Sequence, residues 1–312
     1  MMYKSNLKGT LLLVVAALIW GLAFSAQSTA SSFAPPFFIN CCRSLISTIF
    51  ICLVILIKNK GKNIMPRNTQ DKKFAMKGGI ICGILLAISV NLQQFGFLFY
   101  DKGVSVEARA GFLTALYVIL VPIIATFFKK KTFLTVWIAA VVALCGVYML
   151  CLTNGITGIY IGDLFLFGCA IAFSFHIIFI DKYVNAIGGL RLSMLQFFVC
   201  GIVSGILSLI FEFSGILWVK MVYTDILSVF PQILYLGIMS SGVAYTLQII
   251  GQKYAEPAIA SVAMSLESVF AALGGWIIVG NDLSKREIIG CSLVFIAIII
   301  VQLPDFSKKR KT

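Results

Sequence analysis

Long apolar runs follow one another along the whole chain, and short polar loops separate them. A run of about 20 apolar residues is the length that an α-helix needs to cross the hydrocarbon core of a bilayer. The pattern therefore predicts an all-α integral membrane protein with ten transmembrane helices. The predicted spans are 8–27, 36–57, 75–98, 105–128, 133–152, 160–180, 191–213, 229–250, 257–279 and 287–304.

Composition supports the membrane class, because 60% of the residues are hydrophobic and 12% are charged. Soluble domains carry about 25% charged residues. The net charge of +13 does not indicate a nucleic-acid partner, since Lys and Arg cluster in short loops such as 58–62, 129–131 and 308–311. Loops on the side of the predicted termini carry 19 of these residues and loops on the other side carry 5. The positive-inside rule then predicts a multi-pass protein of the cytoplasmic membrane with both termini in the cytoplasm.

The two halves of the chain resemble each other. ALIWGLAF at 17–24 matches AIAFSFHI at 170–177, and the same offset of 153 places Gln196 where Arg43 stands. LQQFG at 92–96 matches LQIIG at 247–251.

This match divides the chain into residues 1–155 and 156–312, each with five predicted helices. Because five is odd, the second half enters the membrane in the opposite orientation. Such inverted-topology repeats place a substrate site near the midplane, between the repeats.

The sequence offers few residues that could bind a metal ion or a cofactor. The nine cysteines are odd in number, form no CxxC pair and lie mostly in apolar runs, so we interpret them as small hydrophobic residues. A single histidine excludes a multi-histidine metal site, and the chain has no GxxxxGK[ST] motif for ATP. We therefore predict no metal, no cofactor and no catalytic residue.

Glu267 is the only charged residue in the run 257–279, and it lies at its centre. On a helix it shares a side with Ala260, Ala263, Ala271 and Gly274, away from the bulky residues, so we expect it to face the protein interior. A charge at the bilayer centre costs about 2.5–3.5 kcal/mol on insertion scales. Two interpretations stay open: contact with substrate or a coupling proton, or a hydrogen bond that fixes the ninth helix.

Arg43 lies about 10 Å inside the second helix, counted at about 1.5 Å per residue. It can extend outward to the membrane surface, pair with Glu267 or bind an anionic substrate. His176 in the sixth helix is either a cavity residue or a hydrogen-bonded core residue.

Other polar and aromatic residues at membrane depth are expected to face inward, and together they predict a pocket with aromatic walls and a few amides. The candidate substrate-binding or cavity residues are Glu267, Trp20, Asn91, Gln93, Tyr117, His176, Tyr245 and Gln248. The candidate structural or gating residues are Arg43, Gln196, Pro122 and Ser268.

The stretches LIWGLAF (18–24), LQQFG, AGFLTALYVILVP (110–122) and LQIIGQKYAEPAIASVAMSLESVFAALGGW (247–276) resemble the EamA family of the drug/metabolite transporter superfamily. The resemblance implies a cavity lined mainly by helices 1, 3, 4, 6, 8 and 9, with helices 5 and 10 at the periphery. It also implies transport of metabolites, often outward. Many family members read SLEP where this chain has Ser268, so a ninth helix without a central kink is expected, whereas the fourth keeps Pro122.

The function that follows is secondary transport of small organic metabolites, amino-acid-like or amphipathic, by alternating access. The alternatives are a non-transporting scaffold or sensor and, with less support, an intramembrane lipid-modifying enzyme. The expected partners are a small-molecule substrate and the bilayer, with no nucleic acid, and a homodimer stays open.

Overall fold

The computed structural model describes residues 2–60, 69–100, 106–129, 132–152, 158–214, 227–274 and 284–303. These residues form helices, and no strand occurs among them. The helices are α1 (Met2–Ser31), α2 (Pro36–Lys58), α3 (Thr69–Gly96), η1 (Phe97–Phe99), α4 (Val106–Ala115), α5 (Tyr117–Phe127), α6 (Leu134–Cys151), α7 (Ile161–Ile187), α8 (Gly189–Leu207), η2 (Ser208–Glu212), α9 (Phe230–Tyr235), η4 (Leu236–Ala244), α10 (Tyr245–Gln252), α11 (Pro257–Met264), α12 (Leu266–Gly274) and α13 (Lys285–Gln302).

The helical membrane fold is confirmed, and five of the spans consist of more than one helical element. Within the described residues, nine segments are long and apolar enough to cross a membrane. The remaining long helix, α13, begins with the charged residues Lys285, Arg286 and Glu287. The predicted boundary between the halves at residue 155 lies outside the described residues, as do residues 275–279 of the ninth span.

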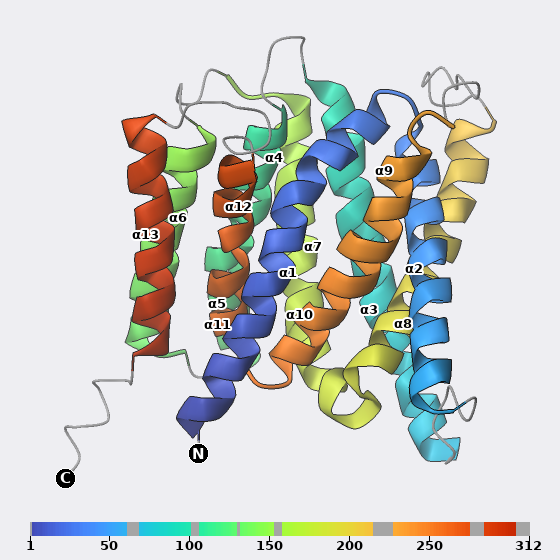
Figure 1. Cartoon of the computed structure of the whole chain (residues 1–312), viewed down its shortest axis with the longest axis horizontal. Helices are drawn as coiled ribbons and strands as arrows, with labels where there is room; N and C mark the ends of the chain where they lie inside the picture. The colour runs from blue at the N-terminus through green and yellow to red at the C-terminus, as the bar shows by residue number, and fades with distance from the viewer. Residues whose placement is uncertain are drawn as a thin grey trace.

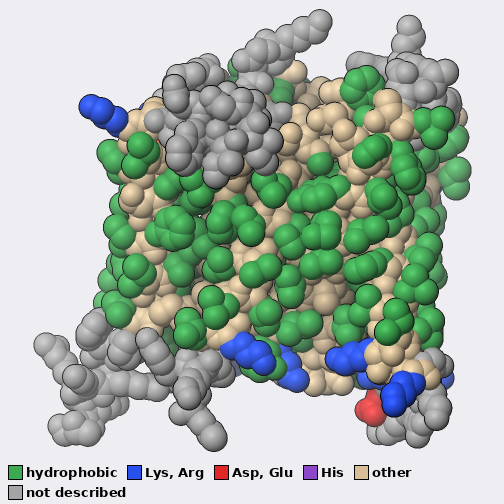
Figure 2. Space-filling view, in the orientation of Figure 1, with side chains coloured by type: hydrophobic (Ala, Val, Ile, Leu, Met, Phe, Trp, Pro, Cys, Tyr) green, Lys and Arg blue, Asp and Glu red, His purple; other side chains and the backbone are tan. Residues whose placement is uncertain are grey.

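The long helices stand side by side, and both termini lie at the same end of the bundle (Figure 1). Figure 2 shows a broad apolar band across the face in view, with most of the visible Lys and Arg side chains along the edge that carries the termini. Large apolar side chains such as Phe127 and Ile57 are about four-fifths exposed, at 81% and 79%. This outer band is suited to contact with lipid tails.

Glycine residues bring several helices into close contact. A Cβ atom added to Gly9 of α1 would lie 2.8 Å from the Gly251 carbonyl oxygen of α10, and one added to Gly21 would lie 2.7 Å from the Glu267 carbonyl oxygen of α12. The same holds for Gly146 of α6 against α13, which pack together at one edge of the bundle (Figure 1). Small residues at such crossings allow the backbones to approach closely in a membrane.

The ninth span is interrupted at Ser265, although Ser268 stands in place of the proline. α11 ends at Met264 and α12 begins at Leu266. The Ser268 N–H donates to the Ser265 carbonyl at 3.2 Å, one residue short of the α-helical spacing, and the Ser265 hydroxyl donates to the Val262 carbonyl at 2.7 Å. Serine side chains that bond to the backbone of the preceding turn distort a helix, so the interruption needs no proline.

The fourth span is interrupted in the same way at Leu116, between α4 and α5. Pro122 lies inside α5, six residues beyond the interruption. The two broken helices occupy matching places in the two halves.

Glu212, at the end of η2, stabilises the start of α2 across the boundary between the halves. Its carboxylate accepts hydrogen bonds from the Phe37 and Phe38 backbone N–H groups at 2.7 and 3.0 Å and from the Ser208 hydroxyl at 2.7 Å. Pro35, the N-cap residue of α2, makes no side-chain cap. A carboxylate from another helix therefore satisfies N–H groups that every helix start leaves unpaired.

Glu212→Ala is expected to lower the free energy of unfolding by about 1–3 kcal/mol, because two partly buried N–H groups lose their acceptor. Thermal unfolding of the purified protein in detergent measures this loss. The matched control is Glu287→Ala, which removes an exposed capping carboxylate at the start of α13. A loss for Glu212→Ala no larger than that for the control would contradict this role.

Candidate functional site

A polar cavity lies inside the bundle, between helices of both halves. Its volume is about 50 Å³, counted as the space open to the centres of water molecules. Its walls are Trp20, Phe24, Gln27, Arg43, Gln93, Thr114, Tyr117, Phe173, Ile177, Ser240, Tyr245, Gln248, Met264 and Glu267. These residues come from helices 1, 3, 4, 6, 8 and 9, as the family resemblance implied, and from helix 2 through Arg43.

Glu267 faces this cavity, as expected from its helical position. Its side chain is 6% exposed, and its Oε1 atom accepts a hydrogen bond of 3.0 Å from the Tyr117 hydroxyl. Tyr117 is the first residue of α5 and Glu267 the second residue of α12, so both follow a helix interruption. Starts of half-helices direct partial positive charge toward a site, which is how many carriers hold a charged ligand at the midplane.

Arg43 is buried at the cavity wall, so the expectation that it extends to the membrane surface is wrong. Its side chain donates from Nε to the Ser241 hydroxyl at 3.0 Å, from Nη1 to Gln27 Oε1 at 3.2 Å and from Nη2 to the Ser240 hydroxyl at 3.5 Å. All three acceptors are neutral. Arg43 and Glu267 also form no ion pair with each other in the described part of the chain.

The π-helical segment η4 positions the Arg43 acceptors. Ser240 and Ser241 both lie in η4, and the Ser240 carbonyl also accepts from the Trp20 indole N–H at 3.1 Å. Wider turns of this kind recur at functional sites, because they redirect side chains and release carbonyl groups.

Aromatic side chains form the rest of the wall. Trp20 and Tyr245 meet edge to face with ring centroids 4.7 Å apart. Gln93 and Gln248, which match each other in the repeat, both face the cavity. Gln93 donates to the Thr114 hydroxyl at 3.2 Å, whereas the Gln248 amide oxygen is buried and finds no partner within the described part of the chain.

Two candidate cavity residues lie elsewhere. Asn91 joins helices by donating to the Ser204 hydroxyl at 2.8 Å and accepting from Asn40 at 3.0 Å. His176 is fully buried, and its Nε2 atom lies 3.0 Å from Gln196 Oε1. Each points toward a neighbouring helix that offers a polar partner, which the sequence of a single helix does not reveal.

The remaining structural candidates also lie outside the cavity walls. Gln196 is bound to His176, and the buried Ser268 and Pro122 lie within their helices without reaching the cavity.

Seven wall residues were absent from the sequence candidates: Phe24, Gln27, Thr114, Phe173, Ile177, Ser240 and Met264. Gln27 carried a usable signal, as a lone amide inside the first apolar run. Ser240 and Thr114 resemble ordinary helix-packing residues, and the apolar members resemble lipid-facing ones.

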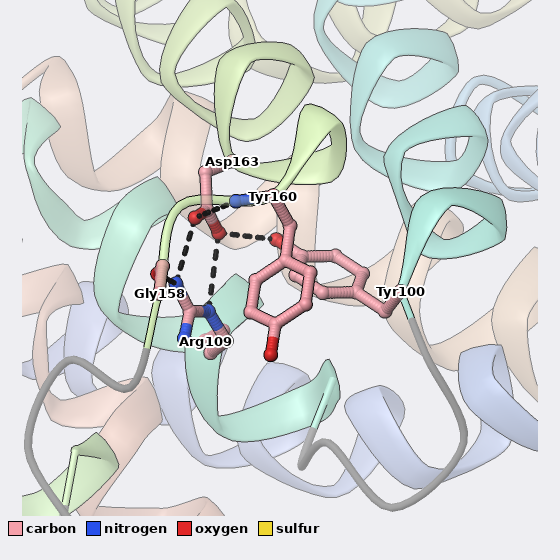
Figure 3. A network of polar contacts seen from close by, with 5 residues as sticks. All are labelled: Tyr100, Arg109, Gly158, Tyr160 and Asp163. Carbon is pink, nitrogen blue, oxygen red and sulfur yellow. Dashed lines mark hydrogen bonds and ion pairs between the residues drawn. The ribbon is translucent and has the colours of Figure 1, made fainter.

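A second polar cluster lies at the end of the bundle away from the termini (Figures 1 and 3). Arg109 of α4 binds Asp163 of α7 through Nη2–Oδ2 at 2.7 Å and Nε–Oδ1 at 3.1 Å, and Nη2 also donates to the Gly158 carbonyl at 2.7 Å. The Tyr100 hydroxyl donates to Asp163 Oδ1 at 2.8 Å, and the guanidinium lies 4.7 Å from the Tyr160 ring centroid. Burial, and then the hydrogen bond to Asp163, raise the pKa of Tyr100, so it stays a neutral donor. The cluster joins a helix of the first half to a helix of the second.

A double-mutant cycle on Arg109→Gln and Asp163→Asn is expected to give a coupling of about 1.5–3 kcal/mol in the free energy of unfolding, because the pair is charged, bidentate and mostly shielded from water. Each single variant leaves the other charge without its partner, so the double variant should lose less than the two single losses added together. Thermal unfolding measures the cycle. Additive losses would mean that the two side chains act independently.

The described residues hold no group of three or more His, Cys, Asp or Glu placed to bind a metal ion.

Comparison with known proteins gives the following matches. The model of the EamA-like transporter family matches residues 7–152 and again residues 160–303. An "Uncharacterized transporter" of Archaeoglobus fulgidus is 28% identical over 296 residues, which cover 93% of this chain and 84% of that protein. A solved structure described as "Crystal structure of protein" has a TM-score of 0.75 at 16% identity and covers 97% of this chain and 99% of its own, so the two share a fold.

Proposed function

Since this chain belongs to the EamA-like transporter family and is a multi-pass membrane transporter, we propose that it carries small amino-acid-like metabolites by alternating access about the central cavity. The substrate class is a zwitterion with a carboxylate, an ammonium group and an apolar part. Outward transport is included in the proposal on the family resemblance alone.

The observation that carries the proposal is one positive and one acidic side chain on the walls of a single cavity. Among the described residues, Arg43 donates only to neutral acceptors, and Glu267 accepts only from the Tyr117 hydroxyl. A planar guanidinium matches the geometry of a carboxylate, and a carboxylate is the natural acceptor for an ammonium group. A zwitterion would place an opposite charge beside each of them.

The remaining walls suit the rest of such a molecule. Trp20, Tyr245 and Phe173 offer ring surfaces to an apolar side chain, and Gln93 and Gln248 offer amides that fix orientation. The unpartnered Gln248 oxygen adds an acceptor directed at the same region.

The present volume supports a closed conformation. A cavity of about 50 Å³ holds a few water molecules, since one water needs about 10–15 Å³ on this measure. An amino acid therefore requires the walls to separate. The interruptions at Leu116 and Ser265 are the expected bending points, and the Arg109–Asp163 cluster is the contact that must break when the end away from the termini opens.

Counterflow in proteoliposomes tests the proposal. Vesicles loaded with an unlabelled amino acid should accumulate the labelled form, and a screen over acidic, basic, small and aromatic side chains should rank the substrates. A matched series of amines and carboxylic acids, each lacking one of the two charges, should show at least about tenfold weaker competition, because a charge-assisted hydrogen bond contributes about 1.5–3 kcal/mol.

Absence of counterflow for every amino acid would refute the substrate class, and its absence for a broad panel of metabolites would favour the scaffold or sensor alternative. Equal competition by the amines and the zwitterions would show that Arg43 does not bind a carboxylate.

A further inference from the structure

A second and larger cavity opens at the end of the bundle that carries the termini. Its volume is about 310 Å³, six times that of the central cavity on the same measure. Its walls are Ile55, Lys58, Asn59, Ile187, Gly188, Gly189, Leu190, Arg191, Ile250, Lys253 and Tyr254. Three of these residues are basic, and the described wall includes no Asp or Glu.

The cavity is built where four helices end or begin, and α7 ends there at Ile187. α2 ends at Lys58, α8 begins at Gly189, and α10 ends at Gln252, one residue before Lys253. The three basic side chains therefore come from three separate elements and meet at one opening. The isoleucines of the wall form an apolar base beneath them.

The inverted repeat supplies an internal comparison for this place. An offset of 153 brings Asn59 onto Glu212, and it brings Leu190 and Arg191 onto Phe37 and Phe38. At the opposite end of the bundle, Glu212 occupies the matching position and accepts hydrogen bonds from the Phe37 and Phe38 N–H groups. At the end with the termini, the neutral amide of Asn59 stands where that carboxylate would be.

Lys58 and Arg191 have no basic counterpart in the matching positions at the other end of the bundle. The same offset places Phe211 opposite Lys58 and Phe38 opposite Arg191. One of the two matching places thus has a carboxylate with apolar neighbours. The other has three basic side chains, and no Asp or Glu, in the described wall of an open cavity, a lining that suits an anionic ligand.

We infer that the cavity walled by Lys58, Arg191 and Lys253 binds a phosphate-bearing anion in the place that Glu212 fills at the other end of the bundle. Arg191 supplies a planar fork for two phosphate oxygens, and the two lysines supply point charges. Because the cavity lies at the ends of helices long enough to span a membrane, a lipid phosphate is one source of such an anion, and the isoleucines of the wall are suited to the first atoms of an acyl chain. This site is separate from the central cavity and does not depend on what the protein transports.

Thermal unfolding of the full-length protein in neutral detergent tests the inference. Phosphatidylglycerol is added in one arm, inorganic phosphate in a second, and sodium chloride at matched ionic strength in a third. Phosphatidylglycerol or phosphate should raise the midpoint by about 2–5 °C above the chloride arm, because a ligand that binds only the folded state stabilises it. A response to phosphatidylglycerol alone assigns the site to a lipid headgroup, and a response to both assigns it to free phosphate as well.

Two variants and a control locate the effect. Arg191→Gln combined with Lys253→Gln should abolish the rise. Lys73→Gln combined with Lys77→Gln, which removes two exposed lysines near the start of α3 outside the cavity wall, should leave it unchanged. Asn59→Glu places a carboxylate at the position matching Glu212, so this variant should unfold at a higher temperature without ligand and should respond to neither anion.

No rise for the wild-type protein in either anion arm overturns the inference. The inference is also overturned if the double variant of Lys73 and Lys77 loses the rise as completely as the double variant of Arg191 and Lys253. If the double variant of Arg191 and Lys253 does not fold, the Asn59→Glu variant gives an independent test. A full response of that variant to either anion would overturn the inference.

Discussion

Glu267→Gln is expected to weaken transport of a zwitterionic substrate by about 10–150-fold in apparent affinity while the protein still inserts and folds. The factor corresponds to the loss of a charge-assisted hydrogen bond of about 1.5–3 kcal/mol. Glutamine keeps the size of the side chain and can still accept from the Tyr117 hydroxyl, so the packing around α12 should survive. The measurement is uptake and counterflow in proteoliposomes over a range of pH.

The same variant separates the two functional roles of the carboxylate. If Glu267 binds the ammonium group, both counterflow and net uptake fall. If it carries a coupling proton, counterflow persists and the pH dependence of net uptake disappears. Tyr117→Phe, which removes the hydroxyl and keeps the carboxylate, should have a smaller effect than Glu267→Gln in either case.

Glu287→Gln is the matched control, because this carboxylate caps α13 at an exposed position. It should transport like the wild type. Wild-type transport by Glu267→Gln at every pH tested would leave Glu267 with a structural role only.

Arg43→Gln is expected to reduce transport of carboxylate-bearing substrates by about 10–150-fold, again from the loss of a charged hydrogen-bond partner. Arg43→Lys should recover only part of this, since an ammonium group lacks the planar fork that pairs with two carboxylate oxygens. Competition by an amine without a carboxylate should change little. The ratio of the two inhibition constants is therefore the readout, and it is insensitive to how much protein folds.

Gln196→Met provides the control for Arg43, because Gln196 is its repeat counterpart and is buried outside the cavity. This variant removes the contact with His176 and should lower the unfolding temperature, but it should leave the ratio of inhibition constants unchanged. An unchanged ratio in Arg43→Gln as well would remove the guanidinium from the binding site.

The helices were predictable because the apolar runs have the length that a membrane span needs. Glu267 faces the interior as expected, but the bulky residues Val262, Leu266 and Val269 on the other side of its helix are buried as well, so the reason given for its direction does not hold. The length of an apolar run can be read from one segment of the sequence, without knowing what that segment packs against.

The cavity depends on relations between segments, and here the sequence was less informative. Arg43 stays inside because η4 presents Ser240 and Ser241 to it, and Asn91 and His176 turn away because Ser204 and Gln196 lie on adjacent helices. Gln93 and Asn91 are two residues apart and therefore point in different directions, although both are amides at the same depth. The interruption at Ser265 was not predicted, because proline was the expected cause of a break and this chain has Ser268 at that place.

The two halves match the same family model but differ in their charges. Gln93 and Gln248 match each other and both face the cavity, whereas Arg43 has the neutral counterpart Gln196, which lies outside the cavity. A cavity with matching walls would accept a two-ended molecule equally well in either of two opposed poses. This cavity has its guanidinium on α2 in the first half and its carboxylate on α12 in the second. A bound zwitterion would therefore adopt a single orientation, with its carboxylate toward α2 and its ammonium group toward α12. Every substrate molecule would then leave the cavity in that same orientation.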